Sequence, residues 1–221
     1  MDGSSERPPK CGWLLGGLVA LLIAFPFLED VARPLVLILP LAAVFVAGVI
    51  AADGGRLHIR CAVAIAAIQV AFTVLSLVVR ERGTVYLVSV AFALVATAVL
   101  ILFSMYCILR YVMRSRLISR DQIFAGICLY VMLGFAFGAV FYLVNILDPS
   151  SFLSANRAAR ESPDLMYFSF VTLATLGYGD ITPRTNAARS LAILEALAGM
   201  LYIAVFMARL VSMRSEPRKS H

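Results

Sequence analysis

The sequence has few charged residues and few of the side chains that most enzymes use. Asp, Glu, Lys and Arg make up 14% of the 221 residues, whereas soluble domains carry about 25%. There are two histidines, His58 and His221, and no nucleophile–base arrangement surrounds either of them. The four cysteines are scattered without a CxxC pair, which disfavours a zinc site or a disulfide framework. We therefore expect neither an enzyme nor an organic cofactor.

Long apolar stretches dominate instead. Apolar residues account for 62% of the chain, above the roughly 45–50% of soluble domains, which indicates a membrane protein. A membrane-spanning helix needs about 20 mostly apolar residues. Five stretches carry no charge and a sixth carries only Glu195; they cover residues 11–28, 34–52, 61–79, 84–109, 122–147 and 190–208. Since no A-x-A cleavage site follows the first stretch, we expect it to be retained rather than removed as a signal peptide.

A shorter apolar run lies between the fifth and sixth stretches. It covers residues 165–179, and runs of this length are typical of re-entrant segments. The preceding Ser162-Pro163-Asp164 is typical of a helix start, with a capping hydroxyl, a proline and an acid. We expect a helix over 163–174 that enters the membrane and stops there. The polar stretch 148–162 before it is predicted to be an exposed loop.

The basic residues predict the orientation of the chain. With six spans both termini lie on one side, and that side holds twelve of the nineteen Lys and Arg residues. The termini are therefore expected in the cytoplasm, with the re-entrant segment opening outward from the plasma membrane. The chain then divides into a cytoplasmic N-terminus, a four-helix membrane domain, a basic cytoplasmic linker, a second membrane domain that contains the re-entrant run, and a short cytoplasmic tail, over residues 1–10, 11–109, 110–121, 122–213 and 214–221.

The re-entrant run ends in "TLATLGYGD", residues 172–180. Irregular backbone at membrane depth is tolerated only where protein buries it or where it lines water. The two glycines of the segment 172–180 permit backbone conformations that other residues avoid. The segment can therefore aim successive carbonyl oxygens toward one axis, and stacked rings of such carbonyls can replace the hydration shell of a cation. The carbonyls belong to Thr175, Leu176, Gly177, Tyr178 and Gly179. One chain supplies a quarter of each ring, so the pattern predicts a homotetramer.

This pattern, T-x-x-T-x-G-Y-G-D, resembles the selectivity filter of potassium channels. The flanking segments "LYVMLGFAFGAVFYLVNILDP" and "ARSLAILEALAGMLYIAVFMARLV" extend the resemblance, over residues 121–213, to small bacterial channels of the ion-transport type. The resemblance implies an all-α integral membrane protein with six transmembrane helices plus a re-entrant pore helix and filter, assembling as a tetramer. The implied function is passive, selective conduction of K+ ions held in the filter.

The resemblance also implies roles for individual side chains. The Thr175 hydroxyl would join the innermost ion site, and the Tyr178 ring would brace the filter against Tyr167 or Phe168. Asp180 would lie at the outer mouth, hydrogen-bonded behind the filter. Some bacterial relatives place an acid on the pore helix as its partner, where this sequence has Val171.

Two residues of the sixth stretch are candidates for supporting the filter. Glu195 can reach the hydroxyls of Ser169 and Thr172 on the pore helix, or it can extend to the outer interface. Gly199 stands where related channels carry a hinge glycine, and close packing is the alternative. Beyond it, Met200, Ile203, Met207 and Val211 recur at helical spacing and line either the cavity or the lipid.

The fourth stretch, 84–109, has no arginine, although voltage-gated relatives carry one at every third position there. We therefore expect little intrinsic voltage dependence. Basic residues follow in the linker, where they serve as a topology signal or bind anionic lipid: Arg110, Arg114, Arg116 and Arg120.

Two other functions stay open. They are a non-selective cation channel, which tends to lack the tyrosine or the second glycine, and a channel-like regulatory subunit.

Overall fold

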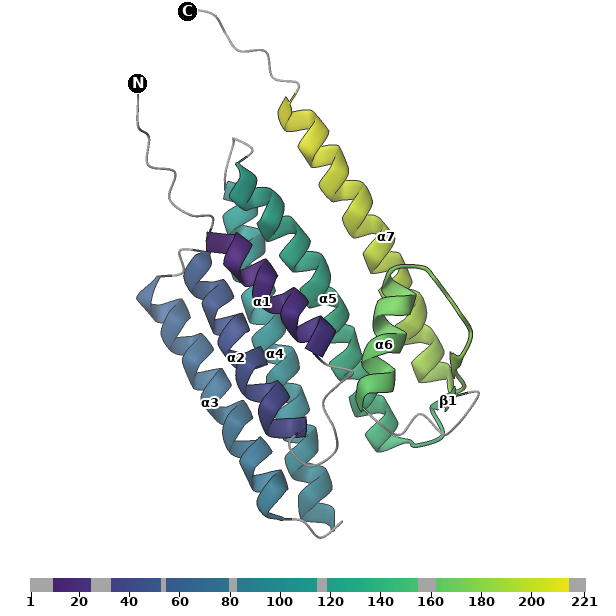
Figure 1. Cartoon of the computed structure of the whole chain (residues 1–221). Coiled ribbons are helices and arrows are strands. Elements are labelled where there is room, and N and C mark those ends of the chain that lie inside the picture. Colours follow the sequence, from purple (N-terminus) through teal and green to yellow (C-terminus); the bar gives the residue numbers. More distant parts are fainter. Residues whose placement is uncertain are drawn as a thin grey trace, which may run out of the picture.

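The computed structural model describes residues 10–24, 33–52, 55–79, 83–114, 119–154 and 162–214, and helices dominate it (Figure 1). The helices are α1 (Lys10–Ala24), α2 (Arg33–Ala51), α3 (Arg56–Val78), α4 (Thr84–Arg114), α5 (Arg120–Leu147), α6 (Ser162–Leu173) and α7 (Asn186–Arg214). Two short strands, β1 (Phe152–Ser154) and β2 (Ile181–Pro183), pair antiparallel. The predicted all-α membrane class is confirmed, whereas the small sheet was not predicted.

Four helices of the described chain are long and apolar enough to cross a membrane: Arg56–Ser76, Thr84–Arg114, Arg120–Leu147 and Asn186–Ser212. They correspond to the third to sixth predicted spans. The described apolar parts of α1 and α2, Cys11–Ala24 and Leu41–Ile50, are shorter. The 15 residues of α1 measure about 22 Å, less than the roughly 30 Å of a hydrocarbon core. The count of six spans therefore stays a prediction.

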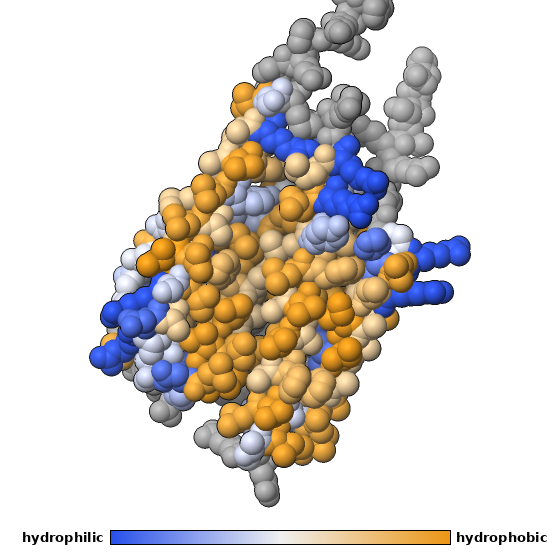
Figure 2. All heavy atoms as spheres, turned by 180° about the vertical axis from the view of Figure 1, so that it is seen from behind, coloured by the Kyte–Doolittle hydropathy of each residue, from blue (hydrophilic) through white to orange (hydrophobic). Residues whose placement is uncertain are grey.

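The surface agrees with a membrane setting. Figure 2 shows apolar side chains over most of one face of the bundle, with hydrophilic ones gathered toward its ends. Large side chains such as Phe92, Leu102 and Tyr106 of α4 are more than half exposed. Exposed apolar area on this scale is unfavourable in water and favourable in lipid. These residues indicate the lipid-facing side of the helix bundle.

The four-helix domain packs on the outer helix α5 of its own chain. α4 buries a stripe of residues at helical spacing, among them Thr97, Ile101, Ser104 and Ile108. The Ser104 hydroxyl donates to the backbone oxygen of Phe45 on α2 at 3.1 Å. The core continues through Met132 and Phe135 of α5 and Leu14 and Leu18 of α1. One continuous core therefore joins α1, α2, α4 and α5.

Three helices meet at Asp121, in the first turn of α5. Its carboxylate accepts the backbone N–H of Cys11 on α1 at 2.7 Å and the hydroxyl of Tyr111 on α4 at 3.0 Å. A capping box between Ser119 and Gln122 closes the start of α5. An acid in this turn also faces the positive end of the helix dipole. Asp121 thus fixes where the four-helix domain joins the pore region.

The predicted linker 110–121 is shorter in the structure, because α4 continues to Arg114 and α5 begins at Arg120. Arg110 and Arg114 therefore lie on the last turns of a helix, with exposed side chains, rather than in a connecting loop. Arg116, the N-terminus before Lys10 and the tail after Arg214 lie outside the described residues. The helix continues because the residues after Leu109 retain good helix propensity and meet no proline or glycine before Arg114.

The loop predicted to be exposed over 148–162 is partly buried. Ser151 and Phe152 are 1% and 3% exposed, and Phe152 begins strand β1. Before it, the hydroxyl and backbone N–H of Ser150 donate to the Asp148 carboxylate, which lowers the pKa of that carboxyl. The prediction was wrong for these residues because a three-residue strand in a polar loop gives no periodic signal. Its partner strand lies about 30 residues further along the chain.

Candidate functional site

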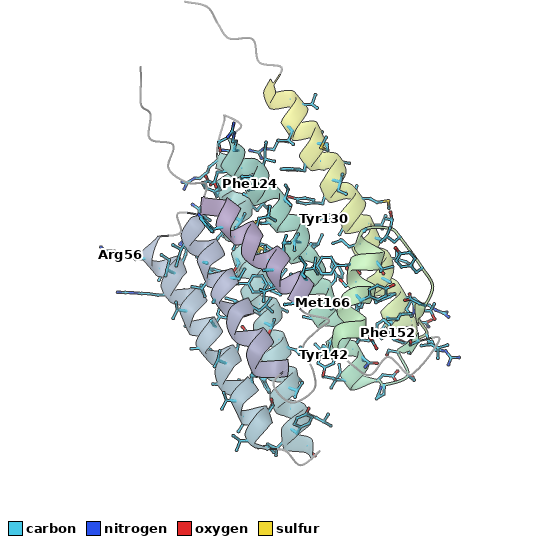
Figure 3. All side chains as sticks on the ribbon, viewed as in Figure 1. Arg56, Phe124, Tyr130, Tyr142, Phe152 and Met166 are labelled. Carbon is cyan, nitrogen blue, oxygen red and sulfur yellow. The ribbon has the colours of Figure 1, made fainter. Side chains whose placement is uncertain are left out.

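The short helix α6 lies between α5 and α7 (Figure 1). Two glycines of α5 permit the close approach: a β-carbon at Gly134 would lie 2.6 Å from the Phe170 ring, and one at Gly138 would lie 2.6 Å from the sulfur of Met166. Met166 reaches toward α5 in Figure 3. The predicted helix over 163–174 matches α6 to within one residue at each end. Its position beside two long helices is that of a re-entrant element.

Backbone hydrogen bonds close the end of α6 and start the segment that follows. The N–H of Thr175 donates to the Thr172 oxygen at 3.0 Å, and the N–H of Leu176 donates to the Val171 oxygen at 2.9 Å. These bonds use carbonyls that a helix end otherwise leaves unpaired. The chain therefore leaves the helix through a tight turn at Thr175 and continues as an extended segment to Asp180.

The segment alternates in backbone handedness. Thr175, Gly177 and Gly179 have positive φ angles of 56°, 59° and 79°, and the two residues between them do not. Alternation of right- and left-handed residues turns successive N–H groups to one concave side, which leaves the carbonyl groups to face the other. Glycine adopts positive φ readily, whereas a β-branched threonine does so only under strain. The geometry supports the predicted row of carbonyl oxygens from Thr175 to Gly179.

Within one chain this row has no cover. Leu176 and Tyr178 are 56% and 67% exposed, and no atom lies within 4 Å of where a β-carbon at Gly177 or Gly179 would stand. The inner helix α7 is also largely exposed. Within its described range 186–212, the buried residues are limited to Ala188, Glu195 and Gly199. Apolar side chains beside an uncovered polar backbone leave a surface that is incomplete in one chain.

Asp180 has a partner that the sequence reasoning missed. The Tyr167 hydroxyl lies near enough to the Asp180 side chain to interact with it, and an oxygen of Asp180 accepts the N–H of Ile181 at 3.0 Å. Tyr167 stands one helical turn before Val171, where relatives carry the acid. Phe168, the other residue considered as a brace for Tyr178, packs against Phe141 and Phe152 instead. A tyrosine four residues before the expected acid was the available sequence signal.

Glu195 lies behind the pore helix and is fully buried. One carboxylate oxygen accepts a hydrogen bond from the Ser169 hydroxyl, which also lies 2.8 Å from the backbone oxygen of Gly134 on α5. The second carboxylate oxygen has no hydrogen-bond partner among the described residues. Of the two hydroxyls considered from the sequence, the structure brings Ser169 to Glu195. The pair links α7 to α6 at the height of the filter, and burial keeps Glu195 from the outer interface.

We expect Glu195→Gln to be milder than Glu195→Leu. Glutamine keeps an oxygen that accepts from Ser169, whereas leucine removes the bond, at a cost of about 1–2 kcal/mol. The measurement is the thermal stability of the purified protein together with its ion flux. A double-mutant cycle with Ser169→Ala isolates the pair, because the cost of losing the separate contact between the Ser169 hydroxyl and the Gly134 oxygen appears in both arms of the cycle and cancels. If both Glu195 variants match the parent, the residue has no bracing role.

Gly199 packs against the end of the pore helix. A β-carbon there would lie 2.7 Å from the backbone oxygen of Leu173, and α7 continues through this position as one helix. The same Leu173 oxygen accepts the hydroxyl of Tyr130 from α5 at 3.1 Å, and Figure 3 shows Tyr130 between α5 and α7. Of the two roles considered for Gly199, the structure supports close packing. Tyr130 gave no sequence signal, since one tyrosine in an apolar helix is typical of a membrane interface.

The far half of α7 is held by a separate set of contacts. The hydroxyl of Tyr202 donates to the backbone oxygen of Gly126 on α5. The guanidinium of Arg209 donates to the backbone oxygen of Val112 on α4 at 2.6 Å. Val112 lies in the last turn of α4, where a cation satisfies unpaired carbonyls and faces the negative end of the helix dipole. The predicted cavity or lipid stripe is exposed in one chain: Met200, Ile203, Met207 and Val211.

These parts define the class of protein. An outer helix, a short helix that ends beside it, a row of backbone carbonyls and a long inner helix are the components of a membrane pore. The sequence model of a family described as ion channel matches residues 127–216, from α5 to just beyond the end of α7. The chain belongs to this ion-channel family. Channels move ions without chemical conversion, so the expectation that the chain is not an enzyme is confirmed.

Curated proteins also match parts of the chain. Protein LctB of Bacillus caldotenax is 30% identical over 99 residues, which cover 42% of this chain and 73% of LctB. Two pore potassium channel c of Oryza sativa subsp. japonica is 36% identical over 84 residues, covering 38% of this chain and 18% of that protein. Two-pore potassium channel 4 of Arabidopsis thaliana is 41% identical over 49 residues, covering 22% and 17%. The chain thus spans under a fifth of these plant relatives. No solved structure matches it.

Proposed function

We propose that the chain is one subunit of a homotetrameric, potassium-selective channel of the plasma membrane that conducts K+ passively. The observation that carries the proposal is the alternating backbone handedness of the exposed segment from Thr175 to Gly179, which can turn its successive carbonyls to one side. Four such rows facing one axis form rings that replace the hydration shell of K+, and the Thr175 hydroxyl adds to the innermost site. The plant relatives named as potassium channels support this choice of ion.

We infer that four residues stabilise the filter through their contacts: Thr172, Asp180, Glu195 and Gly199. Asp180 lies near the Tyr167 hydroxyl, Glu195 accepts a hydrogen bond from Ser169, and Gly199 packs against the Leu173 carbonyl. Each contact joins the filter segment or its pore helix to a neighbouring element. Thr172 adds its backbone oxygen to the turn that starts the filter. The filter geometry then depends on a scaffold built within each subunit, while the rings depend on four subunits.

The proposed orientation places both termini in the cytoplasm. Arg110, Arg114 and Arg120 lie exposed where α4 ends and α5 begins, at the end of α5 opposite to the one that leads into the filter region. Clustered arginines at a membrane surface attract anionic lipid headgroups, at about 1 kcal/mol for each residue. We place the lipid contact at this corner; Arg116, which was predicted to take part, lies outside the described residues.

The experiment is reconstitution of the purified protein in liposomes, with potassium and sodium flux compared and barium added as a pore blocker. The proposal expects potassium flux that exceeds sodium flux and stops with barium. Equal fluxes would support the non-selective cation channel. Absence of flux from a stable tetramer would support the regulatory subunit. A conducting dimer or trimer, identified by cross-linking, would contradict the fourfold ring.

We expect the channel to show little intrinsic voltage dependence. Moving one charge across the membrane field contributes about 2.3 kcal/mol per 100 mV, and steep gating uses roughly 3–4 charges in each subunit. Residues 84–109 of α4 contain no charge. The measurement is a conductance–voltage curve in symmetric potassium with defined lipids. A slope that corresponds to several charges per subunit would contradict the prediction, whereas a shallow slope from ions entering the filter would not.

A further inference from the structure

Among the residues that the structure describes, the filter segment is attached to the rest of its chain at its two ends. At the inner end, the backbone bonds of Thr175 and Leu176 hold it to the pore helix. Between them and Asp180 the residues are exposed, and neither glycine has a neighbouring atom within 4 Å of its β-carbon position. The outer end passes directly from Asp180 into strand β2. Besides the contact between Asp180 and Tyr167 of α6, whatever holds β2 therefore holds the exit of the filter.

Strand β2 is paired with β1, from the loop that follows α5. The register places Phe152 opposite Pro183, Leu153 opposite Thr182 and Ser154 opposite Ile181. The pairing continues past the strands, since the N–H of Arg184 donates to the Ser151 oxygen at 2.8 Å and the hydroxyl of Thr185 to that of Ser151 at 3.3 Å. Thr185 also accepts the N–H of Ala188 and so caps α7. The sheet thus spans the whole connection from the filter to the inner helix.

Phe152 attaches this sheet to the pore helix. It is 3% exposed, and its ring lies 5.4 Å from that of Phe168 on α6 and 5.6 Å from that of Phe141 on α5, centre to centre. Ile181 of β2 is buried in the same cluster. Figure 3 shows Phe152 beside α6. Aromatic rings at these distances and edge-on angles attract beyond their buried area.

We propose that the β1–β2 sheet, anchored on α6 through Phe152, is the outer anchor of the filter and sets how long the filter remains conductive when potassium is withdrawn. The inference rests on the proposed potassium conduction. Carbonyl oxygens crowded around one axis repel one another unless a cation lies between them. When the ions leave, the filter segment departs from its conductive conformation. Because it is fixed at its two ends, the weaker of these two attachments sets the rate of that change. Phe152 is then a positioning residue, because it acts on the carbonyls through β2.

The first test compares two neighbouring residues of β1. Channels in a bilayer are moved from potassium to a potassium-free solution and back, and the loss and recovery of conductance are timed. Phe152→Ala is expected to lose conductance about tenfold faster than the parent. Leu153→Ala, whose parent side chain is 46% exposed on the other face of the strand, is expected to stay within about twofold. If Phe152→Ala prevents assembly, Phe152→Leu takes its place with a smaller effect in the same direction.

The second test strengthens the anchor instead of weakening it. Leu153 and Thr182 lie directly opposite each other on the exposed face of the sheet, so their α-carbons are about 4.5–5.5 Å apart, within the range that a disulfide spans. The pair Leu153→Cys and Thr182→Cys is made with Cys61→Ser, because Cys61 is the exposed native thiol of the described chain. Oxidation is expected to slow the loss of conductance about tenfold, and dithiothreitol to reverse it. The single Leu153→Cys variant is the control, and a monomer-sized band on denaturing gels shows that the bond lies within one chain.

The outcomes separate this inference from the proposed function. If the parent passes no potassium, the proposed function fails, and the anchor is then tested by amide hydrogen exchange of residues 175–180 with the disulfide formed and reduced. Slower exchange in the oxidised protein supports the anchor, and unchanged exchange contradicts it. If the parent conducts but Phe152 and Leu153 variants lose conductance alike, and the disulfide changes nothing, the sheet is not the outer anchor.

Discussion

Replacing Gly177 with alanine is expected to abolish potassium flux. Gly177 has a φ of 59°, and a residue with a β-carbon adopts this conformation at a cost of about 1–2 kcal/mol. No atom lies within 4 Å of the added methyl group in one chain, so this cost is conformational and not a clash within the subunit. Because four subunits contribute to each ring, the total conformational cost is about 4–8 kcal/mol. This cost lowers the conducting population about a thousandfold or more.

The measurement is potassium flux into liposomes, with the particle size of the purified variant as its control. Helices α5 and α7 contribute no contact to Gly177 in one chain, so the variant is expected to assemble like the parent while losing flux. Normal potassium flux in Gly177→Ala would show that residues 175–179 are not the conduction filter. Loss of assembly would instead place the methyl group against a neighbouring subunit.

Gly199→Ala is expected to destabilise the protein strongly. The added methyl group would lie 2.7 Å from the backbone oxygen of Leu173, which cannot rotate away as a side chain can. Either α7 or the end of α6 must shift, and overpacking of this kind costs about 1–3 kcal/mol or more. Because Leu173 lies two residues before the filter, flux should fall together with stability.

Gly16→Ala provides the matched control. Gly16 is also a helical glycine, in α1, but no atom lies within 4 Å of its β-carbon position. Alanine there is expected to raise stability by about 0.5–1 kcal/mol through helix propensity. Thermal unfolding of both purified variants makes the comparison. If Gly199 served only as a hinge, its alanine variant would gain stability like Gly16→Ala and change only opening, which would contradict the packing role.

Local sequence features predicted the long helices and the pore helix well. A stretch of about 20 uncharged residues has no alternative in a membrane to a helix that satisfies its own backbone. For this reason α3, α4, α5 and α7 lie where the apolar stretches are, and α6 begins at Ser162, one residue before the predicted start at Pro163. The boundaries were less accurate at Arg110 and Arg114, because charge marks the edge of the membrane and not the end of a helix.

Contacts between distant residues could not be predicted in the same way. Asp180 lies near the Tyr167 hydroxyl, although the sequence offered Val171 at the position where relatives carry an acid. The Tyr130 hydroxyl reaches Leu173, 43 residues further along the chain. Nothing in the spacing of one helix shows which side chain of another helix will face it. Two roles considered for Gly199 stayed open for the same reason.

The sequence by itself determined that this protein is a helical membrane protein with a re-entrant helix and a glycine-containing carbonyl segment. These properties follow from composition, run length and residue type, which act over a few neighbouring residues. Only the tertiary structure decided that two glycines of α5 permit the close approach of α6, that Glu195 meets Ser169, and that β1 pairs with β2 beyond the filter. These contacts depend on close packing between segments that lie 26 to over 30 residues apart in the sequence. In such packing, a shift of less than an ångström separates a favourable contact from a clash.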